Sequence, residues 1–188
     1  MSAESKMLAL GTKAADFNLP DTISGKMISL NGVKSKTATV VMFLCNHCPY
    51  VQYIQHELAA FVKEYQAKGI SFVGISSNDI ISYPEDSPDR MKQVAKEIGY
   101  TFPYLYDESQ ETARAYEAAC TPEFYVFDKD LKLVYRGQFD DSRPSLSIPV
   151  TGKDLRNALD NIIKGVPVVS NQKPSIGCSI KWKQLQEK

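Results

Sequence analysis

Two cysteines separated by two residues, in the segment Cys45-Asn46-His47-Cys48, have the spacing of a redox-active dithiol. Pro49 follows them and suits the first turn of a helix, where the N–H that proline lacks has no partner. A helix N-terminus stabilises an anion, and the thiolate is the reactive form of cysteine. We therefore predict that the pKa of Cys45 is lowered, that Cys45 attacks disulfides, and that Cys48 resolves the mixed disulfide.

His47 lies between the two cysteines, where a positive charge or a hydrogen bond would stabilise the thiolate. Stabilising the reduced form of a dithiol makes the couple more oxidising. We therefore predict that His47 tunes the redox potential of the pair.

A Cys-x-x-Cys pair is also half of many zinc sites, and a structural zinc ion has four protein ligands. The remaining cysteines, Cys120 and Cys178, do not repeat the spacing, and His56 lies about two helical turns beyond Cys48. The pattern therefore favours redox chemistry and predicts neither a metal nor a cofactor. A metal-binding carrier and a redox-inert interaction module stay open as alternatives.

The composition fits a globular protein, with 43% hydrophobic residues in a chain of 188. The 22 basic and 22 acidic residues balance, which gives no reason to expect nucleic acid or an anionic membrane surface as a partner. The N-terminal sequence MSAESKMLALGTK lacks the apolar run of a signal peptide, and no stretch approaches the length of a membrane span. We therefore expect a cytoplasmic protein.

Strand-like and helix-like segments alternate along the chain, which is typical of an α/β architecture. Residues 39–44 are almost wholly apolar, as expected for a central strand that is buried on both faces. Apolar residues then recur at intervals of three and four over 49–68, which predicts a helix that Gly69 ends. Residues 70–75 form a second predicted central strand. The dithiol thus lies between a buried strand and a long helix.

The other segments are predicted to surround this unit. The sequence Thr151-Gly152-Lys153-Asp154 resembles a capping box at the start of the last helix. Residues 166–188 show no periodicity, so we predict a domain over 1–165 and an extended tail over 166–188. The remaining expected elements are a hairpin over 14–30, helices over 87–98, 109–118 and 151–165, and a hairpin formed by 124–127 and 131–136.

The order of elements, with Thr121-Pro122 before a hairpin, resembles the thioredoxin fold. The segment ADFNLPD at 15–21 resembles the redoxin branch, which includes the peroxiredoxins (alkyl hydroperoxide reductase and thiol-specific antioxidant proteins). The runs CNHCPYV at 45–51 and IGCSIKW at 176–182 are similar to those of a peroxiredoxin-like subgroup. The resemblance implies a central mixed sheet flanked by helices, with an N-terminal hairpin extension.

The same resemblance implies a thiol–disulfide oxidoreductase with an antioxidant or redox-homeostasis role. Its substrates would be disulfide-containing proteins or small thiols, and its reducing partner the thioredoxin or glutathione system. Pro122 would be a cis-proline that faces the dithiol. The backbone of Thr121 would lie beside the sulfurs and pair with an incoming peptide.

The sequence also departs from these families. Leu44 replaces the tryptophan that usually precedes the first cysteine of thioredoxins, and Thr39 replaces their buried acid. Peroxiredoxins carry a Pro-x-x-x-Thr-x-x-Cys motif, whereas Ala38 and Met42 stand at those positions here. A thiol peroxidase, with Cys45 peroxidatic and Cys48 or Cys178 resolving, is therefore the alternative rather than the leading hypothesis.

Several further residues are candidate accessory groups. Cys120 and Cys178 are candidate redox thiols, although a buried apolar role for Cys120 and a passive tail around Cys178 are the simpler expectations. Asn78 and Asp79 end a central strand, where α/β sites often lie. Arg136 and Arg143 can in principle stabilise a thiolate or a peroxide, and Tyr50 can shape the rim of the site, but surface or structural roles are favoured for them.

Overall fold

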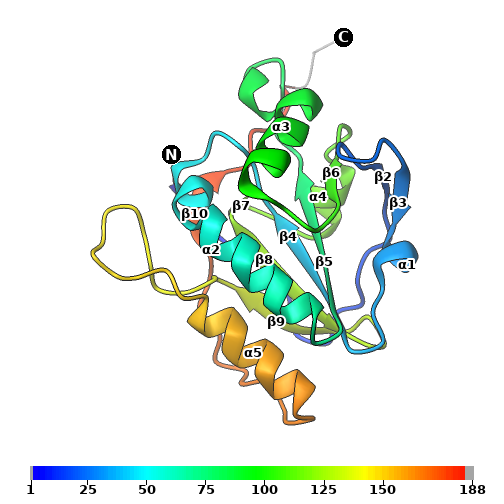
Figure 1. The fold of residues 1–188 in the computed structure, drawn as a ribbon, viewed down its shortest axis with the longest axis vertical. Helices are drawn as coiled ribbons and strands as arrows, with labels where there is room; N and C mark the ends of the chain where they lie inside the picture. Colours follow the sequence, from blue (N-terminus) through cyan, green and yellow to red (C-terminus); the bar gives the residue numbers. More distant parts are fainter. Residues whose placement is uncertain (1, 185–188) are drawn as a thin grey trace.

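The computed structural model describes residues 2–184, and its centre is a five-stranded sheet in the order β6-β5-β4-β8-β9 (Figure 1). The strands are β4 (Ala38–Phe43), β5 (Ile70–Ser76), β6 (Tyr104–Tyr106), β8 (Glu123–Asp128) and β9 (Leu133–Gly137). β4 runs parallel to β5 and antiparallel to β8. The predicted central mixed sheet is therefore confirmed.

β4 occupies the centre of the sheet because both of its faces are apolar. Successive residues of a strand point to opposite faces, so Val40 and Met42 enter one core while Val41 and Phe43 enter the other. The first core is covered by helices α2 (Pro49–Gln66), α3 (Pro88–Ile98) and α5 (Lys153–Ile163). The second is covered by α1 (Leu30–Val33), α4 (Glu111–Ala115) and the N-terminal segment.

The predicted N-terminal hairpin is present. β2 (Asn18–Pro20) and β3 (Met27–Ser29) pair antiparallel, and Asp21 closes the turn between them. The Asp21 carboxylate accepts bonds from the backbone N–H of Ser24 at 3.0 Å and from the backbone N–H of Tyr104 at 3.0 Å. One side chain therefore shapes the turn and attaches the hairpin to the edge strand β6.

α4 is shorter than the helix predicted over 109–118. Gln110 and Glu117 adopt positive φ angles of 63° and 52°, which no residue inside a right-handed helix has. These two residues limit the helix to Glu111–Ala115.

The predicted capping box at Thr151 is wrong. α5 begins after Gly152, which has a φ of 65° and provides no side-chain cap. The backbone N–H groups of Thr151 and Gly152 instead donate to the carboxylate of Asp140, each at 2.6 Å. The acceptor comes from the preceding loop, so the local sequence pattern does not reveal it.

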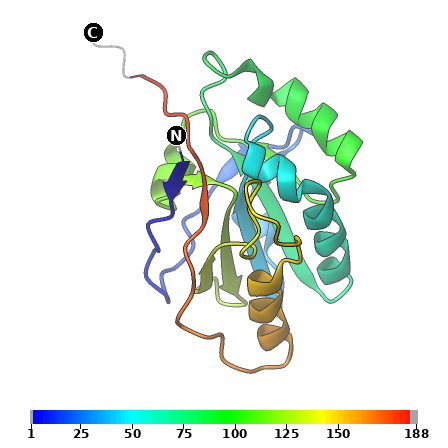
Figure 2. The same cartoon turned by 90° about the vertical axis from the view of Figure 1, so that its left-hand side faces the viewer.

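The predicted tail crosses the molecule beside the N-terminus, as Figure 2 shows. Its described part, 166–184, contains strand β10 (Ile176–Ser179), and residues 185–188 lie outside the described range. β10 lies between β1 (Ser2–Glu4) and β7 (Cys120–Thr121), antiparallel to both. The division at residue 165 stays a prediction, but the tail is joined to the body of the protein through this second sheet.

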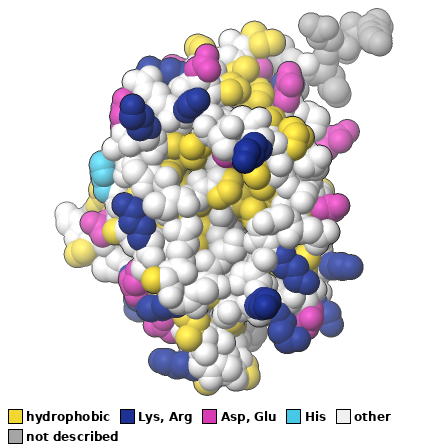
Figure 3. All heavy atoms as spheres, turned by 45° about the vertical axis from the view of Figure 1, so that its right-hand side comes forward, with side chains coloured by type: hydrophobic (Ala, Val, Ile, Leu, Met, Phe, Trp, Pro, Cys, Tyr) yellow, Lys and Arg dark blue, Asp and Glu magenta, His cyan; other side chains and the backbone are white. Residues whose placement is uncertain are grey.

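The surface carries charges of both signs. Figure 3 shows basic and acidic side chains interspersed on one face, with hydrophobic side chains between them. Among residues 2–184, no helix combines the length and the hydrophobicity needed to cross a membrane.

Candidate active site

The dithiol lies where the central strand ends and the longest helix begins. The backbone N–H of Leu44 donates to the carbonyl of Ile75 at 2.9 Å, which continues the sheet up to the residue before Cys45. Cys48 is the N-cap of α2, and the N–H of Val51 donates to its carbonyl at 3.0 Å. Only 1% of Cys45 and 0% of Cys48 is exposed to solvent, so both sulfurs lie inside the protein.

Thr121 contacts both sulfurs. Its hydroxyl lies 3.2 Å from the Sγ of Cys45, and its carbonyl oxygen accepts a bond from the thiol of Cys48 at 3.2 Å. The Thr121–Pro122 peptide bond is cis, as the resemblance implied. The polar groups of one residue are therefore shared between the two cysteines.

The two thiols differ in acidity. Interaction with the Cys48 sulfur, burial and the charge of Asp86 raise the pKa of Cys45 well above its ordinary value. The pKa of Cys48 is lowered to about 5, chiefly because the Cys45 thiol donates to its sulfur. With the protons arranged in this way, the first negative charge lies on Cys48, so the predicted lowering of the Cys45 pKa is not found.

The start of α2 gives a physical reason for this order. Because the helix begins at Pro49, the sulfur at its N-cap belongs to Cys48 and not to Cys45. The backbone N–H groups of Val51 and Cys178 add to the stabilisation of a Cys48 thiolate. The helix end thus acts on the second cysteine of the motif.

Thr121 can also stabilise the state in which Cys48 carries the proton and Cys45 carries the negative charge. In that state, the Cys48 thiol donates to the Thr121 carbonyl, and the Thr121 hydroxyl can donate to a Cys45 thiolate. Two thiols that interact this closely titrate as a pair and share the first negative charge. The geometry therefore lets either sulfur hold the charge.

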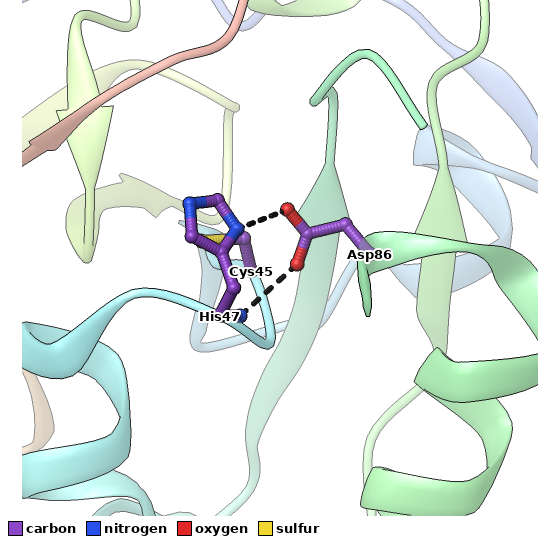
Figure 4. A group of neighbouring side chains, drawn as sticks. All are labelled: Cys45, His47 and Asp86. Carbon is purple, nitrogen blue, oxygen red and sulfur yellow. Dashed lines mark hydrogen bonds and ion pairs between the residues drawn. The ribbon is translucent and has the colours of Figure 1, made fainter. Parts of the chain in front are cut away.

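His47 forms an ion pair with a buried acid. Its Nδ1 lies 2.6 Å from Oδ2 of Asp86, as Figure 4 shows, and the Asp86 side chain is fully buried. The other carboxylate oxygen accepts bonds from the backbone N–H groups of Asn46 and His47, at 2.7 and 3.1 Å. Asn78 donates to Oδ2 through its side-chain amide at 2.8 Å. Four donors therefore hold the Asp86 carboxylate.

This network favours the charged form of both members of the pair. The hydrogen bond to Asp86 raises the pKa of His47. Burial alone would raise the pKa of Asp86, but the hydrogen bonds from His47 and Asn78 outweigh it and lower that pKa. Polar atoms of Cys45, His47 and Asp86 lie within 4.8 Å of one another, and the imidazole stacks on Tyr83 at a centroid distance of 4.9 Å. A cationic ring is thereby fixed next to the dithiol.

The same three side chains have the types of metal ligands, but their donor atoms are already engaged. Both oxygens of Asp86 accept bonds from protein groups, and Nδ1 of His47 points at Asp86. A metal bound between Cys45, His47 and Asp86 would have to break these bonds. The arrangement therefore gives the metal-carrier alternative no support.

Two buried acids, Asp86 and Glu123, are not among the residues that the sequence pattern predicts for the site. Asp86 belongs to the short helix η1 (Pro84–Asp86), inside a polar loop where acids are ordinary, so no local signal distinguishes it. Glu123 follows Pro122 in an otherwise apolar strand, which is an anomaly that a sequence can reveal. It accepts a bond from the hydroxyl of Tyr125 at 2.6 Å, and burial raises its pKa.

The two accessory cysteines lie in different surroundings. Cys120 is fully buried, and its thiol faces the Glu123 carboxylate and the Ser175 carbonyl, each at 3.8 Å. Burial and the charge of Glu123 raise its pKa, so Cys120 has the features of a structural thiol. Cys178 is half-buried and lies directly opposite Thr121 in the pairing of β10 with β7. The structure therefore brings Cys178, and not the Cys120 thiol, to the dithiol.

The other candidate side chains, those of two strand-end residues and two arginines, also differ in the groups that they contact. Asn78 belongs to the Asp86 network, whereas the Asp79 carboxylate accepts bonds within its own loop, including one from Ser82 at 2.7 Å. Arg136 donates to Gln172 at 2.7 Å, and Arg143 donates to backbone carbonyls of its own loop. The guanidinium groups are thus engaged away from the sulfurs.

A Cys-x-x-Cys motif at the end of the central strand, beside a cis-proline, defines a protein of the thioredoxin-fold class. The model of the AhpC/TSA family matches residues 10–136, well over half of the chain. The chain therefore belongs to the AhpC/TSA family, among the redoxins. No match was found among curated proteins.

Solved structures show the same fold. An uncharacterized conserved protein from Geobacillus kaustophilus is 59% identical, with a TM-score of 0.97 and 98% of each chain covered. A hypothetical protein from Sinorhizobium meliloti 1021 is 47% identical, with a TM-score of 0.94 over 97% of this chain and 99% of that one. The thioredoxin domain of a thiol-disulfide oxidoreductase from Bacteroides vulgatus is 20% identical, with a TM-score of 0.60 over 71% and 91%. This last likeness concerns the fold alone.

Proposed function

We propose that the protein is a thiol–disulfide oxidoreductase that uses the Cys45/Cys48 dithiol in an antioxidant or redox-homeostasis role. The observation that supports this most strongly is the contact of both sulfurs with Thr121 beside the cis-proline. The pair also holds one thiolate at neutral pH, since the pKa of Cys48 is about 5. A thiolate next to a second thiol is what disulfide exchange requires.

The proposed reaction has two exchange steps. As a substrate disulfide approaches, the proton moves from Cys45 to Cys48, and the Cys45 thiolate forms a bond to one substrate sulfur. The other substrate sulfur leaves as a thiolate. Cys48 then passes its proton to the substrate thiolate that has left and attacks the Cys45 sulfur, which releases the second substrate thiolate and forms the Cys45–Cys48 disulfide. The substrate gains two electrons, and the dithiol loses two.

His47 acts in this scheme as a positioning and tuning residue. Its charge, held by Asp86 at 2.6 Å, favours a negative charge on the nearby Cys45 sulfur. The reduced dithiol carries a negative charge near this cation, whereas the disulfide carries none. The cation therefore chiefly stabilises the reduced state. We propose that this makes the couple more oxidising than one with a neutral side chain at the same position.

The proposed partners are those expected of such chemistry. A disulfide-containing protein or a small thiol compound serves as substrate, and the thioredoxin or glutathione system restores the dithiol. We propose the cytoplasm as the compartment, because a reducing environment maintains a working dithiol there. Neither nucleic acid nor a membrane surface is part of the proposal.

A thiol peroxidase is the second candidate, and membership of the AhpC/TSA family supports it. Cys45 would attack a peroxide oxygen to give a sulfenic acid and release water or an alcohol, and Cys48 would condense with it to a disulfide and water. The Thr121 hydroxyl lies 3.2 Å from Cys45, but Met42 is a buried apolar residue of β4 and Arg143 binds its own loop. These positions favour disulfide exchange over peroxide reduction.

One preparation tests both candidates. Insulin reduction and peroxide consumption are measured for the wild type and for Cys45→Ser, Cys48→Ser and Cys120→Ala, the last as a buried-cysteine control. Disulfide exchange is expected to be lost in Cys45→Ser and Cys48→Ser and retained in Cys120→Ala. Peroxide turnover far faster than disulfide reduction would favour the peroxidase, and full activity of Cys45→Ser would exclude both mechanisms.

A further inference from the structure

Strand β10 lies against the residue that touches both active-site sulfurs. Its register with β7 puts Cys178 opposite Thr121 and Ser179 opposite Cys120. Gly177 packs so closely that a Cβ at its position would lie 2.0 Å from the Thr121 carbonyl oxygen. The C-terminal segment therefore occupies the position beside Thr121 that an extended peptide would need.

This packing brings a third sulfur to the dithiol. The thiol of Cys178 and its backbone N–H both interact with the Cys48 sulfur, and burial together with this contact raises the pKa of Cys178 to about 12. Cys178 is half-buried, whereas Cys45 and Cys48 are 1% and 0% exposed. Of the three sulfurs around Thr121, Cys178 is the one most accessible to solvent.

The tail is fixed in this position by hydrogen bonds on both sides of Cys178. Before it, the Ser175 hydroxyl donates to the Gly137 carbonyl at 2.6 Å. The backbone N–H of Lys181 donates to Oδ1 of Asn78 at 2.8 Å, and the Gln110 side-chain amide donates to the Lys181 carbonyl at 2.9 Å. Asn78 also donates to Asp86, so one side chain links the tail to the His47–Asp86 pair. The position of Cys178 is thus built into the folded chain.

We propose that Cys178 is a third redox residue, which takes the disulfide from the buried dithiol to the surface. In this step, which rests on the proposed function, the Cys178 sulfur attacks Cys48 in the Cys45–Cys48 disulfide. The Cys178–Cys48 bond forms, the Cys45–Cys48 bond breaks, and the proton of Cys178 passes to the released Cys45 sulfur. No electrons are gained or lost overall.

The chemistry of the reducing partner follows from this relay. A small thiol attacks the Cys178 sulfur from solvent and releases Cys48 as a thiol, and a second thiol releases Cys178 from the mixed disulfide. The partner becomes oxidised to its own disulfide and supplies the two electrons. It never has to enter the space occupied by the buried pair.

The Cys45→Ser variant tests the relay directly, because it leaves Cys48 without its partner in the motif. The full-length variant is oxidised with diamide, free thiols are alkylated, and disulfide-linked tryptic peptides are identified by mass spectrometry. A Cys48–Cys178 link is expected, and Cys120 is expected to stay alkylated. The double variant Cys45→Ser/Cys178→Ser is the control and should keep Cys48 free.

The wild type, treated in parallel, separates the two proposals. A Cys45–Cys48 link in the wild type without a Cys48–Cys178 link in Cys45→Ser overturns the relay and leaves the proposed function standing. Absence of both the Cys45–Cys48 link and its relay product, the Cys48–Cys178 link, in the wild type counts against the proposed function itself.

Two glycine variants in the Cys45→Ser background test the role of β10. Gly177→Ala puts a methyl group against the Thr121 carbonyl and should lower the yield of the Cys48–Cys178 link about tenfold. Gly32→Ala is the matched control, because its added Cβ meets only the Ser29 hydroxyl at 3.4 Å. Equal yields in the two variants would show that the docked strand does not position Cys178.

Discussion

The imidazole of His47 and the carboxylate of Asp86 are joined at 2.6 Å, although the two residues are 39 positions apart in the chain. Asp86 is fully buried and receives four hydrogen bonds, two of them from the backbone of the Cys-x-x-Cys motif. The pair therefore fixes the loop that carries the dithiol and puts a cation beside it.

Replacing Asp86 with asparagine should destabilise the protein in a pH-dependent way. The pKa of His47 is raised above its ordinary 6.5, so its contribution is full below 6.5 and is lost as the pH rises through the raised value. The pKa of Asp86 is lowered below its ordinary 3.8, so its contribution is lost as the pH falls through the lowered value. Between pH 3.8 and 6.5, Asp86→Asn should lose about 3 kcal/mol of unfolding free energy.

Urea denaturation of the wild type and Asp86→Asn at several pH values measures this loss. The Asp89→Asn variant, at the exposed start of α3, controls for the change of net charge. A difference in unfolding free energy that does not change with pH would contradict the ion pair.

The first ionisation of the dithiol should occur near pH 5, with more of the negative charge on Cys48 than on Cys45. Thiolate absorbance in the ultraviolet, followed against pH for the wild type and single cysteine variants, measures it. Cys48→Ser should remove this transition, and Cys45→Ser should move it upward because the thiol that donates to Cys48 is gone. An unchanged transition in Cys48→Ser would assign the low pKa to another cysteine.

The Thr121 hydroxyl should matter for the rate of exchange. It is placed to donate to Cys45 at 3.2 Å when that sulfur carries the negative charge. Thr121→Val should slow the attack of Cys45 on a disulfide about tenfold, as expected for the loss of a hydrogen bond to a charged group. Thr121→Ser keeps the hydroxyl and should restore most of the rate. Equal rates for the valine and serine variants would indicate that only packing is involved.

Asn78 should couple the tail to the active site. Its side chain bonds both the Lys181 backbone N–H and Asp86, so Asn78→Ala should speed hydrogen exchange of the Lys181 amide about fivefold. Asp79→Ala is the control, because the Asp79 side chain bonds only within its own loop in the described structure. Exchange of the Lys181 amide at the wild-type rate in Asn78→Ala would show that the tail is held by other contacts.

Features that depend on local sequence were predictable. The apolar run before Cys45, the helix after Pro49 and Thr121-Pro122 before a hairpin define the fold, and each depends on neighbours in the chain. Helix boundaries were less predictable. The Asp154 N–H, which Thr151 was expected to bind, donates to the Phe139 carbonyl instead, and Asp140 binds the N–H groups of Thr151 and Gly152.

Features that depend on contacts between distant segments were not predictable. Asp86 looks like an ordinary loop acid in the sequence, and only folding brings it to His47. The order of acidity of Cys45 and Cys48 depends on where α2 begins and on the approach of Cys178, more than 100 residues away in the chain. A spacing motif identifies the reactive pair, but it does not show which sulfur holds the charge.

The equilibrium between the dithiol and the Cys45–Cys48 disulfide tests the proposed function most directly. The protein is equilibrated in dithiothreitol and glutathione buffers of defined potential, quenched in acid and alkylated, and the fraction of Cys45 in a disulfide is measured by mass spectrometry. A Cys48 pKa of about 5 stabilises the reduced form. We predict a two-electron transition at a potential above about −270 mV, the value of thioredoxin. If Cys45 and Cys48 both stay alkylatable across the whole range of potentials, the proposed function is contradicted.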